Sequence, residues 1–376
     1  MEEVSLIKCF SDITDPRMLK KTDHKLVDII VMAICAVICG ADKWTQIEEF
    51  CESRYSWFKQ FLELPGGIPS HDTFGRVFSI LSPSHFQKCF HKWIQAVFEM
   101  TEGQVIAIDG KTLRRSFNKK DKKSSLHMVH AWATTNGVLL GQQKSQDKSN
   151  EIKAIPELLE IISVKGCIVT TDAMGCQRKI AEKIYEKQGD YLLAVKDNQK
   201  GLKEAMDKTF THAIKIDFDN MVYDYSKTLD ADHGRIEQRE CYVLPLMYLW
   251  SFKLKWKGLK SLVLVRSEVI DKATGEIKKE SRYYITSLKM QAANILQAVR
   301  RHWAVENSLH WCLDVGFRED ECRSRMGDST ENFSLIRRIA LMLLKHEQSL
   351  KGGIQTKRLK AGWDQNYLLK VLRTSS

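Results

Sequence analysis

The sequence lacks the features of a secreted or membrane-bound protein. Its longest apolar run, residues 29–39, is well short of the roughly 20 residues needed to span a bilayer. The start of the chain, Met1 to Val4, shows no signal peptide, and none of the ten cysteines forms a CxxC pair. We therefore expect reduced thiols and a cytoplasmic protein without a membrane partner. The sequence also shows no internal repeat, low-complexity tract or heptad pattern.

Positive charge, by contrast, is in excess. The chain carries 58 Lys and Arg residues against 47 Asp and Glu residues, which gives a net charge of +11. A surplus of this size favours a polyanionic partner such as nucleic acid, although charge that only keeps the protein in solution is the simpler alternative. A length of 376 residues allows two or three domains, each with its own core.

Residues 1–95 are predicted to form a helical N-terminal domain. A core helix is expected at 26–40 and an amphipathic helix at 44–62. Ser70 is a suitable N-cap for a further helix at 73–81. Two helices joined by a tight turn are typical of helix-turn-helix DNA readers. Because the second helix carries a single Arg, we favour a helical domain that packs on the next one.

Two short apolar strands each end in an aspartate. Residues 105–108 (VIAI) precede Asp109, and residues 167–171 (CIVTT) precede Asp172. Runs this short and this rich in Val and Ile are typical of buried strands. If the two strands are neighbours in one sheet, both carboxylates lie at the same edge. An aspartate at a strand end is also common as a turn or capping residue, and spacing alone leaves that alternative open.

The elements that follow predict an α/β protein with a ribonuclease-H-like mixed sheet. Asn136-Gly137, between two alternating strands, is a strong hairpin signal. Three strands are followed by helix, strand, helix and strand, an order that places the first strand beside a parallel fourth one, so that Asp109 and Asp172 become neighbours. After the first strand we predict, in order, strands at 126–134 and 138–144, a helix at 151–162, the strand before Asp172, a helix at 177–187 and a strand at 191–195.

The rest of the chain completes and interrupts this core. We assign residues 96–200 and 288–345 to the core and residues 201–287 to a mostly β insertion. Residues 346–376 are rich in Lys and Arg and are predicted to form a basic tail on the surface. Within these parts we predict a helix at 202–211, strands near 241–244, 259–269 and 282–287, and helices at 292–313 and 330–344.

A third acidic residue lies in an unusual helical cluster. His302, Glu306 and His310 stand four residues apart and so share one face of the predicted helix. A carboxylate between two imidazoles suits a functional site, and a salt-bridged exposed face is the alternative. Spacing does not choose among the acids here, and the rivals are Asp314, Glu319, Asp320 and Glu321. A zinc site is a further alternative with no standard spacing, built from His302, His310, Cys312 and Cys322.

Carboxylates brought together at strand ends repel one another unless a cation lies between them. Hard oxygen ligands in small number suit Mg²⁺ or Mn²⁺. Two such ions, about 3.5–4 Å apart, activate the attacking oxygen and stabilise the leaving oxygen of a phosphodiester. The sequence therefore predicts a site for two Mg²⁺ ions, for which Mn²⁺ can substitute, at the sheet edge that carries Asp109 and Asp172.

Four motifs together resemble the H-repeat-associated transposases, a bacterial insertion-sequence family of the DDE class. They are residues 106–115 (IAIDGKTLRR), 148–152 (KSNEI), 170–177 (TTDAMGCQ) and 302–311 (HWAVENSLHW), and the likeness extends over nearly the whole chain. The resemblance implies a ribonuclease-H-like catalytic core whose acidic triad is Asp109, Asp172 and Glu306. Related DDE transposases place Tyr, Arg and Lys around the catalytic Glu, whereas this chain has Val299, His302 and Leu313.

The resemblance further implies a transposase that cuts double-stranded DNA at the terminal inverted repeats of its element and joins the ends to target DNA. Asp109 and Asp172 would bridge the two Mg²⁺ ions, and Glu306 would complete one coordination shell. Pairing two ends implies at least a homodimer, located on the bacterial nucleoid. The alternatives are a domesticated or inactive transposase that only binds DNA, and a standalone DNA nuclease. The residues predicted to contact DNA are Lys111, Arg114, Arg115, Lys119, Lys120, Lys122, Lys123, Arg235, Arg301, His302, Asn307 and His310.

Overall fold

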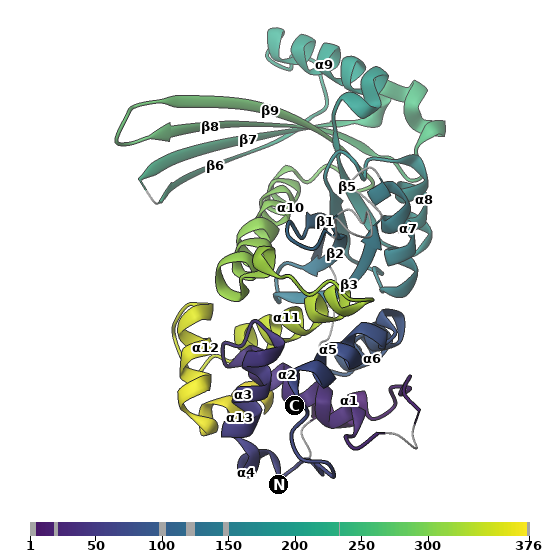
Figure 1. Ribbon diagram of the computed structural model, residues 1–376. Helices are drawn as coiled ribbons and strands as arrows, with labels where there is room; N and C mark the ends of the chain where they lie inside the picture. The colour runs from purple at the N-terminus through teal and green to yellow at the C-terminus, as the bar shows by residue number, and fades with distance from the viewer. Residues whose placement is uncertain are drawn as a thin grey trace.

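A single mixed β-sheet organises the computed structural model, which describes residues 5–18, 22–97, 103–117, 125–145, 150–232 and 234–373 (Figure 1). In these residues the strands are β1 (Val105–Thr112), β2 (His127–Ala133), β3 (Val138–Ser145), β4 (Ile168–Thr171), β5 (Asp190–Val195), β6 (Asp224–Asp232), β7 (Arg235–Pro245), β8 (Ser261–Asp271) and β9 (Ile277–Thr286). They lie in the order β3-β2-β1-β4-β5-β9-β8-β7-β6, so the strands of the predicted core and of the predicted insertion share one sheet.

The first five strands lie in the predicted order. β1 pairs antiparallel with β2 and parallel with β4, and β5 extends the parallel part of the sheet. Ile108 lies opposite Thr171, so the residues that follow them, Asp109 and Asp172, are neighbours, as predicted. The hairpin predicted at Asn136-Gly137 is also confirmed, and Gly137 has a φ of 65°, a conformation that favours glycine.

Helices cover both faces of this half of the sheet (Figure 1). α7 (Glu151–Ile161) and α8 (Arg178–Glu186) lie on one face, and α10 (Ala292–Val305) lies on the other. β1 contributes to both layers because its side chains alternate in direction. Val105 packs with the buried residues of α10, whereas Ile106 belongs to the larger core that includes α7 and α8. Packing on both faces fixes the strand end from which Asp109 projects.

The predicted insertion is a long antiparallel arm that extends away from the core (Figure 1). Its helix is confirmed as α9 (Lys200–Lys215), which follows the short 3₁₀ segment η3 (Asp197–Gln199). A further 3₁₀ segment, η4 (Leu246–Lys255), connects β7 to β8. The prediction missed β6 and recognised only the inner end of β7. β6 alternates between half-buried and exposed residues without a buried position, so its sequence lacks the strong apolar alternation that marks a strand.

The N-terminal and C-terminal helices pack together at the opposite end of the molecule (Figure 1). Residues 29–38 of the predicted core helix have no exposed surface. The helix predicted at 44–62 is wrong in extent, because Arg54, with φ −116°, separates it into two. The N-cap at Ser70 is confirmed by a 3.3 Å hydrogen bond from the Thr73 amide. These helices are α1 (Ser5–Phe10), α2 (Leu26–Ile38), α3 (Trp44–Ser53), α4 (Tyr55–Phe58), α5 (His71–Ile80), α6 (Pro83–Val97), α11 (Ser329–His346), α12 (Ile354–Trp363) and α13 (Gln365–Arg373).

The interpretation of residues 346–376 as a basic surface tail is wrong for α12 and α13. Lys357 and Arg358 are only 6% and 2% exposed. Lys357 donates a 2.9 Å hydrogen bond to the carbonyl of Leu344, and Arg358 donates one of the same length to Val37. Both carbonyls lie in the last turn of a helix, where the helix dipole favours a cation. Two of the positive charges of this segment, on Lys357 and Arg358, therefore hold helices together inside the protein.

Two sequence-based expectations about compartment are also addressed by the structure. Among the described residues, no helix is long and apolar enough to cross a membrane. The apolar helix α2 packs against α11 instead. All ten cysteines are free thiols, as predicted from their spacing.

Candidate active site

Asp109 and Asp172 are held by backbone hydrogen bonds at adjacent strand ends. The Asp109 Oδ1 atom accepts from the Gly110 amide at 2.9 Å. The Asp172 Oδ1 atom accepts from the amides of Met174 and Gly175 at 2.9 and 3.3 Å. In each carboxylate these bonds use Oδ1 and leave Oδ2 for another ligand. The Asp109 carboxylate is thereby presented to the helix that follows β9.

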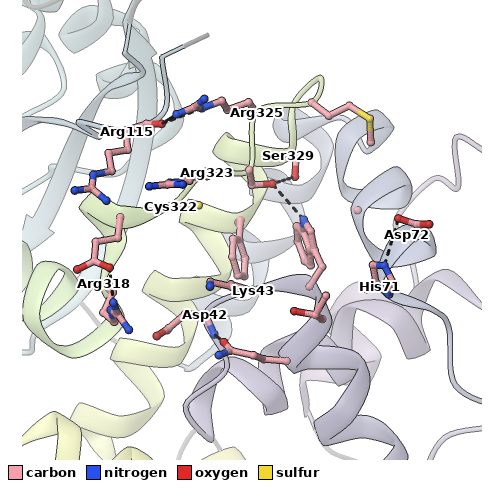
Figure 2. A pocket seen from close by; sticks show the side chains of 18 of the residues that line it. Asp42, Lys43, His71, Asp72, Arg115, Arg318, Cys322, Arg323, Arg325 and Ser329 are labelled. Carbon is pink, nitrogen blue, oxygen red and sulfur yellow. Dashed lines mark hydrogen bonds and ion pairs between the residues drawn. The ribbon is translucent and has the colours of Figure 1, made fainter.

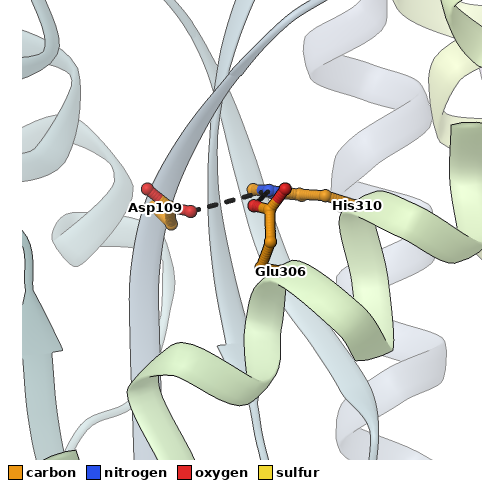
Figure 3. Close-up of side chains that lie close together, drawn as sticks. All are labelled: Asp109, Glu306 and His310. Atoms are coloured by element: carbon orange, nitrogen blue, oxygen red, sulfur yellow. Dashed lines mark hydrogen bonds and ion pairs between the residues drawn. The ribbon is translucent and has the colours of Figure 1, made fainter. Parts of the chain in front are cut away.

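Glu306 reaches Asp109 from a widened part of that helix (Figure 3). After Val305, α10 passes into two π-helical turns, η5 (Glu306–His310) and η6 (Cys312–Gly316). π-helical turns are rare in proteins, but those that occur often lie at functional sites. The His310 Nδ1 atom lies 3.1 Å from Glu306 Oε2 and 3.6 Å from Asp109 Oδ2. One ligand atom from each of the three residues lies within 4.8 Å of the others.

The electrostatics of this group favour a bound cation. Burial raises the pKa of Asp109 to about 7, and the charges of Asp172, Glu151 and Glu306 contribute in the same direction, against the hydrogen bond from Gly110. Burial lowers the pKa of His310, which favours the neutral imidazole that binds metals. Two carboxylates and a neutral imidazole fit a divalent metal ion, whose charge would relieve the repulsion. The Asp172 carboxylate lies outside the 4.8 Å group.

His302 is not part of this group, contrary to the prediction that it shares a functional face with Glu306 and His310. Its Nδ1 atom lies 2.9 Å from the hydroxyl of Thr170, inside the protein. Burial lowers the pKa of His302 to about 4, so the imidazole is neutral near pH 7. Burial and the neutral form disfavour the predicted phosphate contact by His302, which stays a prediction. His310, 4% exposed, is unsuited to that role for the same reason of burial.

Lys111 is buried in an ion pair, which disfavours its predicted role as a DNA contact. Its side chain is 8% exposed, and its Nζ atom lies 2.7 and 2.6 Å from the two oxygens of Asp314. Arg114 is different, because its side chain is 83% exposed while its Nε atom contacts Asp320 at 3.2 Å. Of these two cations, only Arg114 is accessible to a large polyanion.

The other predicted DNA-binding residues are spread over the molecule. Arg115 lines a groove beside the N-terminal helices. Arg301 is half-buried and Asn307 is exposed, and they flank Glu306. Arg235 begins β7 at the outer end of the arm, about 30 Å from Pro245 at roughly 3.3 Å per residue. Lys119, Lys120, Lys122 and Lys123 lie outside the described residues.

The rival acids each have a cationic partner in the structure. Such pairs account for these residues without a metal. The pairs are Asp314 with Lys111, Glu319 with Arg338, Asp320 with Arg114, and Glu321 with Arg318. The zinc alternative also fails, because the described residues bring together only Asp109, Glu306 and His310, and Cys312 donates to the Asn307 carbonyl.

Sequence reasoning missed a buried contact between a histidine and a carboxylate directly behind Asp109. His127 Nε2 lies 2.6 Å from Glu151 Oε1, and both side chains are at most 5% exposed. Thr112 holds the other ring nitrogen of His127 at 2.8 Å. The Glu151 charge acts on Asp109, whose pKa it raises. The motif at 148–152 contained the only signal, but its spacing does not reveal the partner.

We predict that Gly110→Ala disrupts this pair and the site in front of it. A Cβ atom at Gly110 would lie 2.6 Å from His127 Nε2 and 2.8 Å from Glu151 Cδ. Relieving that overlap should cost about 1–3 kcal/mol and displace Asp109. Urea unfolding and a DNA cleavage assay measure the two effects. Gly201→Ala is the control, because its Cβ meets nothing within 4 Å in α9 and should slightly stabilise the helix. Equal stability and activity of the two variants would contradict the prediction.

The raised pKa of Asp109 predicts a pH-dependent gain in stability for Asp109→Asn without metal. The carboxyl has an ordinary pKa of 3.8 and a folded-state pKa of about 7. Between these values the folded state binds more protons than the unfolded state, so wild-type stability falls as the pH rises. The Asp109→Asn variant has no carboxyl group here and does not lose stability in this way. Above pH 7 its free energy of unfolding should exceed that of wild type by about 4 kcal/mol at most. Thermal unfolding in EDTA from pH 4 to pH 8 tests this, and a pH-independent difference would contradict it.

Comparison with known proteins agrees with the motifs in the site. The family described as "Transposase DDE domain" matches residues 100–343, and the family described as "DDE_Tnp_1-associated" matches residues 7–94. The first match includes Asp109, Asp172 and Glu306. It covers more than half of the chain.

Similar proteins span the whole chain. The "H repeat-associated putative transposase YhhI" of Escherichia coli strain K12 is 43% identical, covering 100% of this chain and 99% of the relative. The "Putative transposase YncI" of E. coli O157:H7 is 43% identical over 99% of this chain and 95% of its own length. A shorter relative, "Inactive transposase YbfQ" of strain K12, is 44% identical over 21% of this chain.

Proposed function

This chain belongs to the transposase DDE domain family, and on that premise we propose that it is an active transposase that cuts DNA at the ends of its insertion sequence and transfers them into target DNA. The observation that carries the proposal is the convergence of Asp109 and Glu306, from elements almost 200 residues apart, beside the strand end that bears Asp172. An intact acidic constellation is what phosphoryl transfer at a metal site requires.

The proposed fold of the catalytic part is ribonuclease-H-like. Its support is the strand order β3-β2-β1-β4-β5, with β1 antiparallel to β2 and parallel to β4. We propose residues 96–200 and 288–345 as this core, residues 201–287 as its insertion, and residues 1–95 as a helical N-terminal domain. The pairing of β5 with β9 explains how the insertion continues the sheet of the core.

Mg²⁺ is the proposed cofactor, with Asp109, Asp172 and Glu306 as its ligands and with two ions in the active protein. Such ions, when bound, supply an activated water and stabilise charge on the leaving oxygen. The chain itself supplies the orientation of the ligands. The backbone turn after Asp172 fixes one carboxylate. His310 holds the Glu306 side chain, which is 68% exposed, toward Asp109 and so acts as a positioning residue.

The proposed partner is double-stranded DNA, both the terminal repeats of the element and the target. The proposed contacts are Arg114, Arg115, Arg301, Asn307 and Arg235, whereas the burial of Lys111, His302 and His310 disfavours these three. The lysines of residues 119–123 stay a prediction. A homodimer or larger assembly on the nucleoid is proposed because two DNA ends must be joined in one event.

One observation favours a second candidate, a transposase that binds DNA without cutting it. A relative is named "Inactive transposase", although it matches only 21% of this chain. The presence of all three acids argues for activity. A strand-transfer assay with a pre-cut element end separates the possibilities. Joined product is the expected result, nicks without joining would indicate a nuclease, and a mobility shift without either would indicate a binding protein.

A further inference from the structure

A groove separate from the carboxylate site lies between the N-terminal helices and the segment after η6 (Figure 2). Its volume is about 940 Å³. One wall comes from α3 and α5, and the other comes from residues 318–329 together with Arg115, which follows β1. Asp109, Asp172 and Glu306 do not line it. The groove therefore needs an explanation of its own.

Positive charge predominates in this groove. Six of its lining residues are Lys or Arg and three are Asp or Glu. Two of the acids are already neutralised, Asp42 by Arg358 at 3.0 Å and Glu321 by Arg318. The remaining cations come from three distant parts of the chain, and they are Lys43, Arg76, Arg115, Arg323 and Arg325. Cations gathered in this way repel one another unless an anion lies between them.

Two of these cations are ready to bind. Lys43 and Arg323 are exposed, and neither side chain has a hydrogen-bond or ion-pair partner in the part of the chain that the structure describes. Figure 2 shows them on facing walls of the groove. Arg325 is fixed differently, because its Nη2 atom donates to the carbonyl of Arg115 at 2.9 Å. That bond joins the segment after η6 to the chain that leaves β1.

The floor of the groove is aromatic and rigid. The Trp44 ring stacks on the Phe78 ring, with 5.1 Å between ring centroids, and its centroid lies 4.5 Å from that of Phe333. Its Nε1 atom donates a 3.2 Å hydrogen bond to Ser324 Oγ. Because neighbouring rings already occupy its faces, Trp44 is not a platform on which a nucleobase stacks. The free binding groups of the groove are thus its cations, and cations without base-reading partners contact phosphate regardless of sequence.

The groove lies within a short reach of the carboxylates. Arg115 follows Asp109 by six residues, a separation of at most about 20 Å for an extended chain at roughly 3.4 Å per residue. The same length corresponds to about six base pairs of DNA at 3.4 Å per step. A DNA strand that is bound at Asp109 and runs toward Arg115 would meet this groove within its first turn. An isolated small anion would not need cations from three segments over such a volume.

We propose that this groove binds the phosphate backbone of the DNA strand that continues from the bond at the carboxylate site, with Lys43 and Arg323 as phosphate contacts. The proposal rests on the proposed function for the identity of the polyanion. It assigns to the N-terminal helices a sequence-independent grip on DNA. The bound DNA strand would then run continuously from the carboxylate site into the groove.

The salt dependence of DNA binding tests this proposal. The probe is a fluorescent 30-base-pair duplex of arbitrary sequence, measured by anisotropy in EDTA between 0.05 and 0.3 M salt. Lys43→Ala and Arg323→Ala should each lower the slope of log affinity against log salt by about 0.9 and weaken binding about eightfold at 0.1 M salt. Lys208→Ala, which removes an exposed charge on α9, is the matched control. It should change the slope and the affinity only by the small amount expected from losing a distant positive charge. Wild-type slopes in both groove variants would overturn the proposal.

A second measurement locates the DNA. A photo-crosslinking amino acid in place of Met326, which is 54% exposed in the groove, should crosslink to the duplex, whereas the same residue at position 208 should not. Crosslinks from position 326 to a second copy of the chain instead of DNA would also overturn the proposal. Both tests omit the metal, so their outcome is independent of cleavage. A wild-type protein that binds through this groove but never cuts or joins DNA would refute the proposed function alone.

Discussion

Asp109→Asn, Asp172→Asn and Glu306→Gln are each expected to abolish Mg²⁺-dependent cleavage of element-end DNA while the protein stays folded. Each substitution removes one charge from a group proposed to hold the metal ions. Losing the several kcal/mol of transition-state stabilisation that such ions supply slows the reaction about a thousandfold or more. Cleavage of a labelled duplex with the terminal repeat of the element, under single-turnover conditions, measures the loss.

The fold should survive because none of these side chains holds the core together. Asp109 contacts Gly110 and His310, Glu306 is 68% exposed as a side chain, and Asp172 caps a local turn. Glu186→Gln, an exposed acid on α8, is the matched control and should keep full activity. A triad variant that unfolds cooperatively like wild type and still cuts DNA at the wild-type rate would refute the assignment.

A readout besides activity separates metal binding from other roles. Wild type should gain thermal stability when Mg²⁺ is added, because a ligand that binds only the folded state stabilises it. The three variants should gain less. For Asp109→Asn the comparison starts from a higher metal-free stability above pH 7, since the raised pKa of the aspartate no longer opposes folding. Stabilisation by Mg²⁺ equal to that of wild type in all three variants would place the ions elsewhere.

The part of the fold that the sequence predicts well is the part with buried strands and specific turn residues. The apolar segments VIAI (105–108) and CIVTT (167–171) favour burial as strands of a sheet. Asn136-Gly137 predicts a tight hairpin between β2 and β3. From these the neighbouring ends of β1 and β4 follow. The edge strand β6 could not be found in the same way, because it has no buried position and therefore lacks a strong apolar alternation.

In the candidate site, the acids were predictable and the cations were not. An apolar strand fixes the position of the aspartate that follows it, at the end of the strand. The sequence does not indicate whether a Lys or Arg side chain is buried. The sequence predicts both Lys111 and Arg358 at the surface, yet each is at most 8% exposed and neutralises a partner more than 200 residues away. The π-turns at Glu306 could not be predicted either, because they keep the apolar spacing of an ordinary helix. Burial of a charge is a tertiary property.

Arg338→Leu is expected to lower the free energy of unfolding by about 3–5 kcal/mol, because it leaves an unpaired carboxylate in the core. Arg338 and Glu319 have no exposed side-chain surface, and their atoms pair at 2.6 and 3.2 Å. Burial alone would raise the pKa of Glu319, but the charges of Arg338 and Arg337 outweigh it and lower the pKa. The pair also fixes residues 319–321 between the carboxylate site and the groove, so activity should fall as well.

The neighbouring residue provides a matched control for this prediction. Arg337 is equally buried, yet its three nitrogens find no hydrogen-bond partner among the described residues, and it stacks over Phe333 at 4.0 Å. Arg337→Leu therefore removes a charge without breaking a bidentate pair and should cost less than Arg338→Leu in urea unfolding. The double variant Glu319→Leu with Arg338→Leu should recover most of the loss, because an apolar pair replaces an ionic one at little net cost. A double variant as unstable as Arg338→Leu would show that lost packing, and not the stranded charge of Glu319, dominates.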